Sequence, residues 1–92
     1  MRLNADTLAS GHRFKATVAV FGSGPAGLTV AKTLAERGVN VLVAEGGDVD
    51  FTDRSQSLYE GEQVGGPDLL IDSTRLRMFG GTSNHWGGFC RC

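Results

Sequence analysis

Two short apolar runs with a helix-forming segment between them dominate the pattern of this chain. Residues 16–21 (ATVAVF) and 39–44 (VNVLVA) are nearly continuous apolar runs rich in β-branched side chains. Such runs are typical of strands covered on both faces in a parallel sheet. Residues 25–37 are good helix formers, and small residues recur every four positions from Gly27 to Ala35. The pattern therefore predicts a strand, a helix that packs closely on a sheet, and a second parallel strand.

The predicted helix has recognisable start and stop signals. Pro25 suits the first helical turn, because its missing N–H has no intrahelical partner there. Gly38 stands where a left-handed C-cap is favoured, so the helix is expected to end near Arg37. A crossover of this length fits the right-handed connection of a βαβ unit.

The rest of the chain has weaker patterns. Residues 46–66 are polar and rich in turn formers, and we expect a long loop there. Residues 67–79 combine an apolar patch with a helix-compatible stretch at positions 75–78, which predicts one short helix. Residues 80–92 (GGTSNHWGGFCRC) are a second glycine-rich loop with many small polar side chains.

Composition narrows the class of protein. The formal net charge is -1, which gives no indication of nucleic acid or an anionic membrane as a partner. Residues 1–15 contain no apolar run that could serve as a secretory signal, and there is no transmembrane segment. Cys90 and Cys92 are too few for a disulfide framework or a zinc site, so we expect reduced thiols, no metal and a cytoplasmic location.

The strongest candidate chemistry lies between the two predicted strands. The motif Gly22-x-Gly24-x-x-Gly27 follows a strand and opens a helix, and Glu45 ends the second strand 23 residues after Gly22. In a dinucleotide-binding unit the three glycines allow a tight turn, the approach of a pyrophosphate and close packing of the helix. An acid at the end of the second strand binds a ribose hydroxyl and argues against NADP.

The motif alone leaves the nucleotide undecided. FAD and NAD use the same turn and the same acid, and a tight turn that binds nothing is a further alternative. The second glycine loop, residues 80–88, places backbone N–H groups and polar side chains in a short span. Such a loop fits an extended cofactor, although a glycine-rich surface turn with Trp86 in a core is the alternative. The second loop therefore favours FAD.

Two segments resemble a known family. GSGPAGLTVAKTLAERGVNVLVAEGG, followed by RLRMFGGTSNHWGG, is similar to the N-terminal part of the glucose-methanol-choline family of FAD oxidoreductases. The TSNHW sequence is most similar to the branch that contains pyranose oxidase. The resemblance spans residues 17–88, and residues 51–68 match poorly.

The resemblance implies specific roles. The first motif would bind the ADP pyrophosphate, Glu45 the adenosine ribose, and the second motif would lie beside the pyrophosphate and the flavin. His85 is implied as a candidate for a covalent bond to the flavin, with a noncovalent neighbour as the alternative. The residues expected to contact the cofactor are Gly22, Ser23, Gly24, Pro25, Ala26, Gly27, Glu45, Gly46, Arg75, Gly80, Gly81, Thr82, Ser83, Asn84, His85, Trp86 and Gly87.

The chain departs from that family in length. Its members are several times longer, with a substrate domain and catalytic bases far toward the C-terminus, so catalytic residues stay unassigned here. We therefore expect an α/β fold in which residues 1–92 are a partial Rossmann-like FAD-binding domain without a substrate domain. Two strands and one good helix cannot cover a sheet, which indicates a fragment, a truncated reading frame, or a subunit completed by another polypeptide.

Three functions from different classes follow. The first is the FAD-binding part of an oxidoreductase that takes a hydride from the CH–OH group of a small alcohol. We expect that alcohol to be a sugar or glycoside. The second is a nucleotide-binding subunit or remnant without catalysis. The third is a fragment of an NAD-dependent dehydrogenase, which leaves residues 80–88 unexplained.

Overall fold

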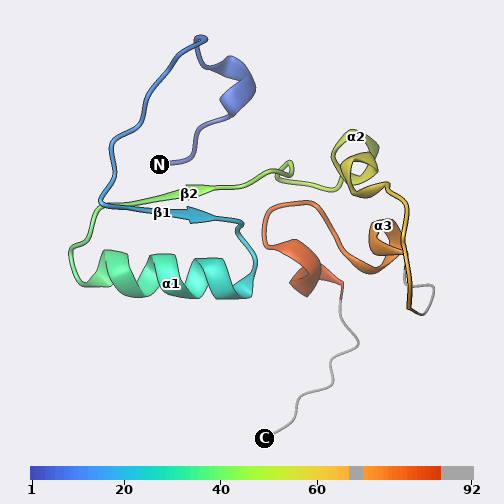
Figure 1. Cartoon of the computed structure of the whole chain (residues 1–92). Helices are drawn as coiled ribbons and strands as arrows, with labels where there is room; N and C mark the ends of the chain where they lie inside the picture. The colour runs from blue at the N-terminus through green and yellow to red at the C-terminus, as the bar shows by residue number, and fades with distance from the viewer. Residues whose placement is uncertain (67–69, 86–92) are drawn as a thin grey trace, which may run out of the picture.

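The first half of the chain forms the predicted βαβ unit. The computed structural model describes residues 1–66 and 70–85. Strands β1 (Val18–Phe21) and β2 (Val41–Ala44) pair in parallel, and α1 (Pro25–Glu36) connects them (Figure 1). Phe21 pairs with Ala44, so both strands end at the same edge of the sheet. The α/β class and the parallel arrangement are confirmed, and each strand begins two residues later than predicted.

Both ends of α1 follow the sequence signals. Pro25 is its first residue. At the other end Gly38 has φ +78°, its N–H donates to the Ala35 carbonyl at 2.9 Å, and the Val39 N–H donates to the Leu34 carbonyl at 3.0 Å. This pair of bonds is the Schellman arrangement, which satisfies carbonyls that the helix end leaves free.

The small-residue face of α1 packs on the sheet over only part of its length. Ala31 is 8% exposed and is the one apolar residue that is buried among the described residues. Gly27 makes a close contact with the turn before the helix. Ala35, in contrast, is exposed. Each four-residue step turns about 40° around the helix axis, so Ala35 lies about 80° from Gly27 and leaves the contact face.

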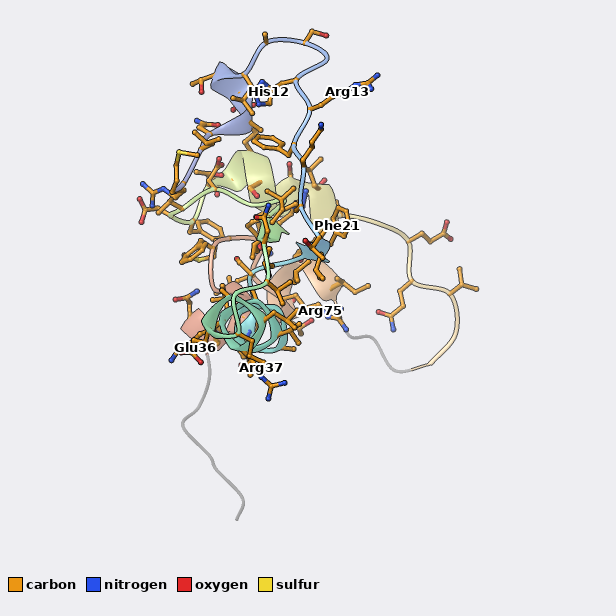
Figure 2. All side chains as sticks on the ribbon, turned by 90° about the vertical axis from the view of Figure 1, so that its left-hand side faces the viewer. His12, Arg13, Phe21, Glu36, Arg37 and Arg75 are labelled. Carbon is orange, nitrogen blue, oxygen red and sulfur yellow. The ribbon has the colours of Figure 1, made fainter. Side chains whose placement is uncertain are left out.

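The prediction that the strands are covered on both faces is wrong for β1 in the described chain, whereas all four residues of β2 are half-buried. Along β1, Val18 and Val20 are half-buried on the α1 side, whereas Ala19 and Phe21 are exposed. Phe21 is 85% exposed (Figure 2). Helix α1 packs on one face (Figure 1). On the other side the N-terminal segment arches above the strands without burying Phe21, and α2 and α3 lie beyond the strand ends (Figure 1).

The segment expected to be a long loop contains a short helical pair. Helix α2 (Asp53–Gln56) continues into the 3-10 turn η2 (Ser57–Tyr59). The Thr52 hydroxyl caps α2 by accepting the Ser55 N–H at 3.2 Å. A four-residue helix is too short to show a hydrophobic period, which is why the pattern missed it.

The short helix expected within residues 67–79 lies earlier than positions 75–78. Helix α3 spans Ile71–Thr74, and Arg75 is extended, with φ -129° and ψ 139°. The chain then returns to the sheet edge, where Met78 forms a parallel bridge with Asp48. The Phe79 N–H donates to the Asp48 carbonyl at 2.8 Å. This pairing competes with the helix and places the second glycine loop beside the first.

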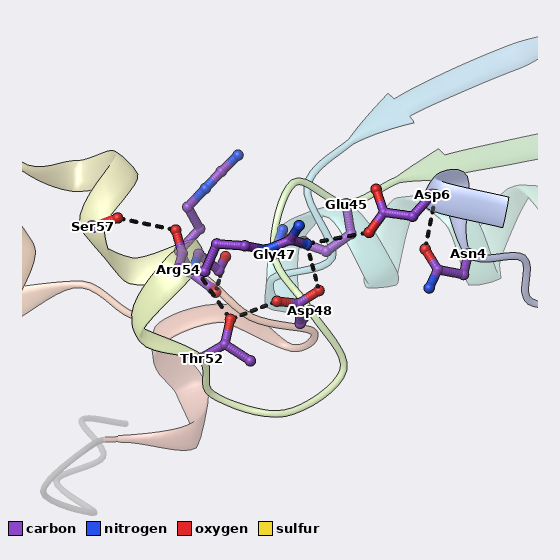
Figure 3. Close-up of polar contacts among 10 residues, drawn as sticks. Asn4, Asp6, Glu45, Gly47, Asp48, Thr52, Arg54 and Ser57 are labelled. Atoms are coloured by element: carbon purple, nitrogen blue, oxygen red, sulfur yellow. Dashed lines mark hydrogen bonds and ion pairs between the residues drawn. The ribbon is translucent and has the colours of Figure 1, made fainter. Parts of the chain in front are cut away.

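The N-terminal segment carries the 3-10 turn η1 (Ala5–Thr7). It is tied to α2 by an exposed ion pair between Arg54 and Asp6, with 3.3 Å between the charged atoms (Figure 3). Arg54 also lies 3.6 Å from Asp48. Among the described residues, no helix has the length and apolar character needed to cross a bilayer.

Candidate functional site

The site begins at the turn that joins β1 to α1. Gly22 has φ +97°, a conformation that residues with a side chain rarely adopt. Its N–H donates to the Ala44 carbonyl at 2.8 Å. A Cβ at Gly27 would overlap the Gly22 carbonyl oxygen and lie 3.3 Å from Val20 Cγ1. The geometry matches the tight turn and close helix packing expected of these two glycines.

Gly24 is different, because it faces open space. An added Cβ there would meet no protein atom within 4 Å, and its φ of -67° is accessible to any residue. Pro25 follows as the first residue of α1. The first turn of a helix leaves N–H groups without intrahelical partners and carries about half a positive charge. The open side of Gly24 therefore adjoins a place suited to an anion.

Glu45 lies at the end of β2 and is held by the first turn. One carboxylate oxygen, Oε2, accepts the Ser23 N–H at 2.7 Å and the Ser23 hydroxyl at 2.6 Å. The other, Oε1, accepts the Gly47 N–H at 2.8 Å (Figure 3). The carboxylate is thus fixed in place between β1 and β2 at the strand ends.

These bonds also set the charge of the carboxylate. Burial by itself raises the pKa of Glu45, but the bonds from Ser23 and from the backbone of Gly46 and Gly47 outweigh it. The net result is a pKa below the ordinary value of 4.5. Hydrogen bonds to the ionised form favour that form, so Glu45 is a carboxylate at neutral pH.

The second glycine loop packs directly on the first. The Gly80 N–H donates to the Ser23 hydroxyl oxygen at 3.0 Å. A Cβ at Gly81 would lie 3.3 Å from Gly24 Cα. Gly80 and Gly81 have φ of +85° and +63°, and these left-handed conformations let the backbone come this close. Two loops more than fifty positions apart in the sequence therefore share one site.

The polar side chains of the second loop divide into two groups. Thr82 and Ser83 line the groove described below. Asn84 instead donates to the carbonyls of Phe79 and Gly81, at 2.9 and 3.0 Å, and so stabilises its own loop. His85 is exposed and follows the 3-10 turn η3 (Gly81–Asn84).

An open groove of about 850 Å³ runs between the two loops and η2. This volume lies within the range of about 300–1,000 Å³ that is usual for ligand sites. The groove also has the open side of Gly24, a helix N-terminus and an ionised carboxylate, which are features that a dinucleotide needs. Its lining residues are Gly22, Gly24, Pro25, Glu45, Tyr59, Thr74, Arg75, Leu76, Met78, Gly81, Thr82 and Ser83.

The structure gathers about half of the predicted contact residues in the groove. The first glycine turn, Glu45, Arg75 and part of the second loop line it. Predicted residues that do not line it are Ser23, Ala26, Gly27, Gly46, Gly80, Asn84 and His85. The predictions for Trp86 and Gly87 lie outside the described residues.

Four lining residues were not expected from the sequence, namely Tyr59, Thr74, Leu76 and Met78. Tyr59 is the one tyrosine of the chain, within a polar segment, which is the signal that could have identified it. Arg77 lies behind it, with its guanidinium 5.9 Å from the Tyr59 ring centroid and against Gly46. Thr74 could not be found because the four-residue helix α3 shows no hydrophobic period. Leu76 and Met78 could not be found because they reach the groove in the extended segment that follows α3.

No cluster of three or more potential metal ligands occurs among the residues that the structure describes. The two histidines of the chain, His12 and His85, do not line the groove. Glu45 and Arg75 are therefore the charged side chains of the groove, beside glycines, hydroxyl residues and the larger side chains of Tyr59, Leu76 and Met78.

Comparison with known proteins agrees with this geometry. Residues 15–58, just under half of the chain, match the FAD binding domain family. The match covers the first glycine turn, α1 and Glu45 and stops before the second loop. No curated protein and no solved structure matches the chain significantly. The match favours FAD over NAD for the first glycine turn.

Proposed function

We propose that this flavin-binding domain, whose cofactor is FAD, is part of an oxidoreductase that oxidises a CH–OH donor. One observation supports the FAD site in this proposal. The second glycine loop packs on the first through Gly80 and Ser23, so that Gly24 and Thr82 line the same groove. A simple nucleotide turn does not require a second loop, whereas an extended cofactor with a pyrophosphate centre benefits from contacts on both sides.

The residues of the groove have distinct roles in this proposal. The N-terminus of α1 stabilises the two phosphates, and Gly24 leaves space for them to approach the backbone. Glu45 accepts hydrogen bonds from the adenosine ribose. Each carboxylate oxygen can accept two bonds. Oε1 accepts the Gly47 N–H, and a ribose hydroxyl would take its second acceptor position in place of the weaker contact with the Gly46 backbone.

The substrate class comes from the family resemblance. Residues 75–88 are similar to the second motif of the glucose-methanol-choline family, and TSNHW is most similar to the pyranose oxidase branch. Bound FAD would supply the acceptor for a hydride in the oxidation of such an alcohol to a carbonyl compound. A sugar or glycoside is therefore the proposed donor, and the catalytic base is not among the residues assigned to the groove.

The same resemblance makes His85 the candidate for a covalent bond to the flavin. His85 is exposed and follows the loop that packs on Gly24, although it does not itself line the groove. The alternative is a histidine that neighbours the flavin without a bond. Acid precipitation of the flavin-loaded protein distinguishes the two.

We also propose that residues 1–92 are part of a FAD-binding domain whose sheet is completed by further polypeptide. The support is the outer face of the sheet, where Phe21 is 85% exposed. An aromatic side chain on a two-stranded sheet is a strong sign of an uncovered packing surface. A second candidate function, a FAD-holding subunit without catalysis, is supported by the position of both histidines outside the groove.

The test uses the full chain and measures two properties in order. An absorption band of flavin at about 450 nm is expected for the purified protein. Absence of this band would contradict FAD binding. Reduction of that band by an alcohol or sugar donor under anaerobic conditions is then expected. A bound flavin that no member of a donor panel reduces would support the noncatalytic candidate instead.

A further inference from the structure

The hydroxyl of Ser23 connects three parts of the site. Ser23 has no exposed surface. Its Oγ lies 2.6 Å from Glu45 Oε2 and 3.0 Å from the Gly80 nitrogen. A serine hydroxyl has one proton and two lone pairs. The Gly80 N–H can only donate, so the Ser23 proton must be given to Glu45.

The bonds therefore form a chain with a fixed direction. The Gly80 N–H donates to Ser23, and Ser23 donates to the Glu45 carboxylate. A bond to a carboxylate is shorter and stronger than a neutral one, and it polarises the hydroxyl so that its oxygen becomes a better acceptor. The charge on Glu45 thus strengthens the bond that holds Gly80.

We propose that Ser23 is a positioning residue that couples Glu45 to the second glycine loop, so that the ribose contact and the loop contact of FAD form together. The inference rests on the proposed FAD site and identifies Ser23 as the residue that connects its two loops. Ser23 does not touch the cofactor, because its side chain is fully buried and does not line the groove.

The backbone of the second loop explains why such a connection is needed. Gly80 and Gly81 both have positive φ, and glycine loses more conformational freedom on ordering than any other residue. A loop of this kind needs contacts that fix it. Ser23 supplies one such contact from the first glycine turn by accepting the Gly80 N–H at 3.0 Å. The next residue, Gly81, packs on Gly24 of the same turn.

The experiment is a double-mutant cycle on FAD affinity in the full chain. Ser23→Ala, Glu45→Gln and the double variant are titrated with FAD. Ser23→Ala is expected to raise Kd by about tenfold or more. The two effects should be strongly non-additive, because Ser23 acts through Glu45. Additive effects, or an unchanged Kd in Ser23→Ala, would overturn the inference. Thr29→Ala removes an exposed hydroxyl that bonds to the Pro25 carbonyl, and this control should keep the original Kd.

A second readout does not depend on FAD. The Gly80 amide is expected to exchange its hydrogen slowly in the original chain and at least about tenfold faster in Ser23→Ala. Should Ser23→Ala fail to fold, the original chain is sufficient, because fast exchange of the Gly80 amide there contradicts the inference. Should the protein bind no FAD at all, the proposed function fails, whereas the exchange measurement still decides the link between Ser23 and Gly80.

Discussion

The α-carbon of Gly27 lies so close to the carbonyl oxygen of Gly22 that a side chain on Gly27 would overlap it. Gly24, three positions earlier, faces open space with no protein atom within 4 Å of a Cβ. Two glycines of one motif therefore have separate physical tasks. Gly27 allows the helix to pack, and in the proposed site Gly24 leaves room for the phosphates of the cofactor.

Gly27→Ala tests the packing task. The added methyl must displace the Gly22 carbonyl or shift α1, and overpacking of this kind costs about 1–3 kcal/mol. We expect the free energy of unfolding, measured by urea denaturation of the full chain, to fall by this amount. Unchanged stability would show that the turn can relax.

Gly24→Ala is the matched change at the ligand side. Its φ of -67° suits alanine, and no protein atom is in the way, so stability should change by no more than about 0.5 kcal/mol. FAD uptake, measured by visible absorbance after gel filtration, should be abolished because the methyl occupies the phosphate approach. Normal loading of FAD in this variant would contradict the proposed site.

Glu45 predicts a specific pH dependence of stability. Its folded pKa lies below 4.5, whereas the unfolded chain has the ordinary value. The stabilisation is therefore fully present above pH 4.5 and is lost as the pH falls through the folded pKa. Urea denaturation of the original chain and of Glu45→Gln should differ most near neutral pH, and the difference should shrink in acid. Glu36→Gln, at the exposed end of α1, controls for removal of a surface carboxylate.

Gln56 should stabilise the return of the chain to the sheet edge. Its amide nitrogen donates to the carbonyls of Asp72 and Arg75, and its oxygen accepts the Arg77 N–H at 3.0 Å. Gln56→Ala leaves these groups without partners, and we expect a loss of about 1–3 kcal/mol. Gln56→Glu keeps the acceptor but sets a charged carboxylate oxygen against the two carbonyls, so a loss at least as large as that of Gln56→Ala is expected. Ser57→Ala, an adjacent exposed change, should be nearly neutral.

His85 is tested by acid precipitation. If the proposed bond exists, the flavin stays with the precipitated protein, and His85→Ala releases it to the supernatant. Release of the flavin from the original chain would establish a noncovalent cofactor and contradict the proposed bond. His12→Ala is the control, because His12 packs against Phe14 with 4.7 Å between the ring centroids, away from the groove lining.

The sequence was most informative where local chemistry decides the structure. The positive φ of Gly22 and Gly38, the start of α1 at Pro25 and the parallel pairing of both strands were all expected. Each depends on steric limits within a few residues or on a strong apolar run. The ends of both strands and the position of Glu45 directly after the second strand could be predicted for the same reason.

Other features could not be predicted, because they depend on contacts between distant segments. The helix expected at positions 75–78 is replaced by an extended segment that pairs with Asp48. The exposure of Ala35 and Phe21 depends on where α1 and the other elements lie. Tyr59 reaches the groove only because α2 and η2 fold back toward it.

From the sequence alone follow the βαβ unit, the glycine turn and the acid that faces it, since steric rules for glycine, proline and β-branched residues act locally. Only the tertiary structure brings Ser23, Glu45 and Gly80 together. Hydrogen bonds across 22 and 57 positions leave no periodic trace in the chain. They form because the strand ends place both loops at one edge, where a buried hydroxyl needs a donor and an acceptor.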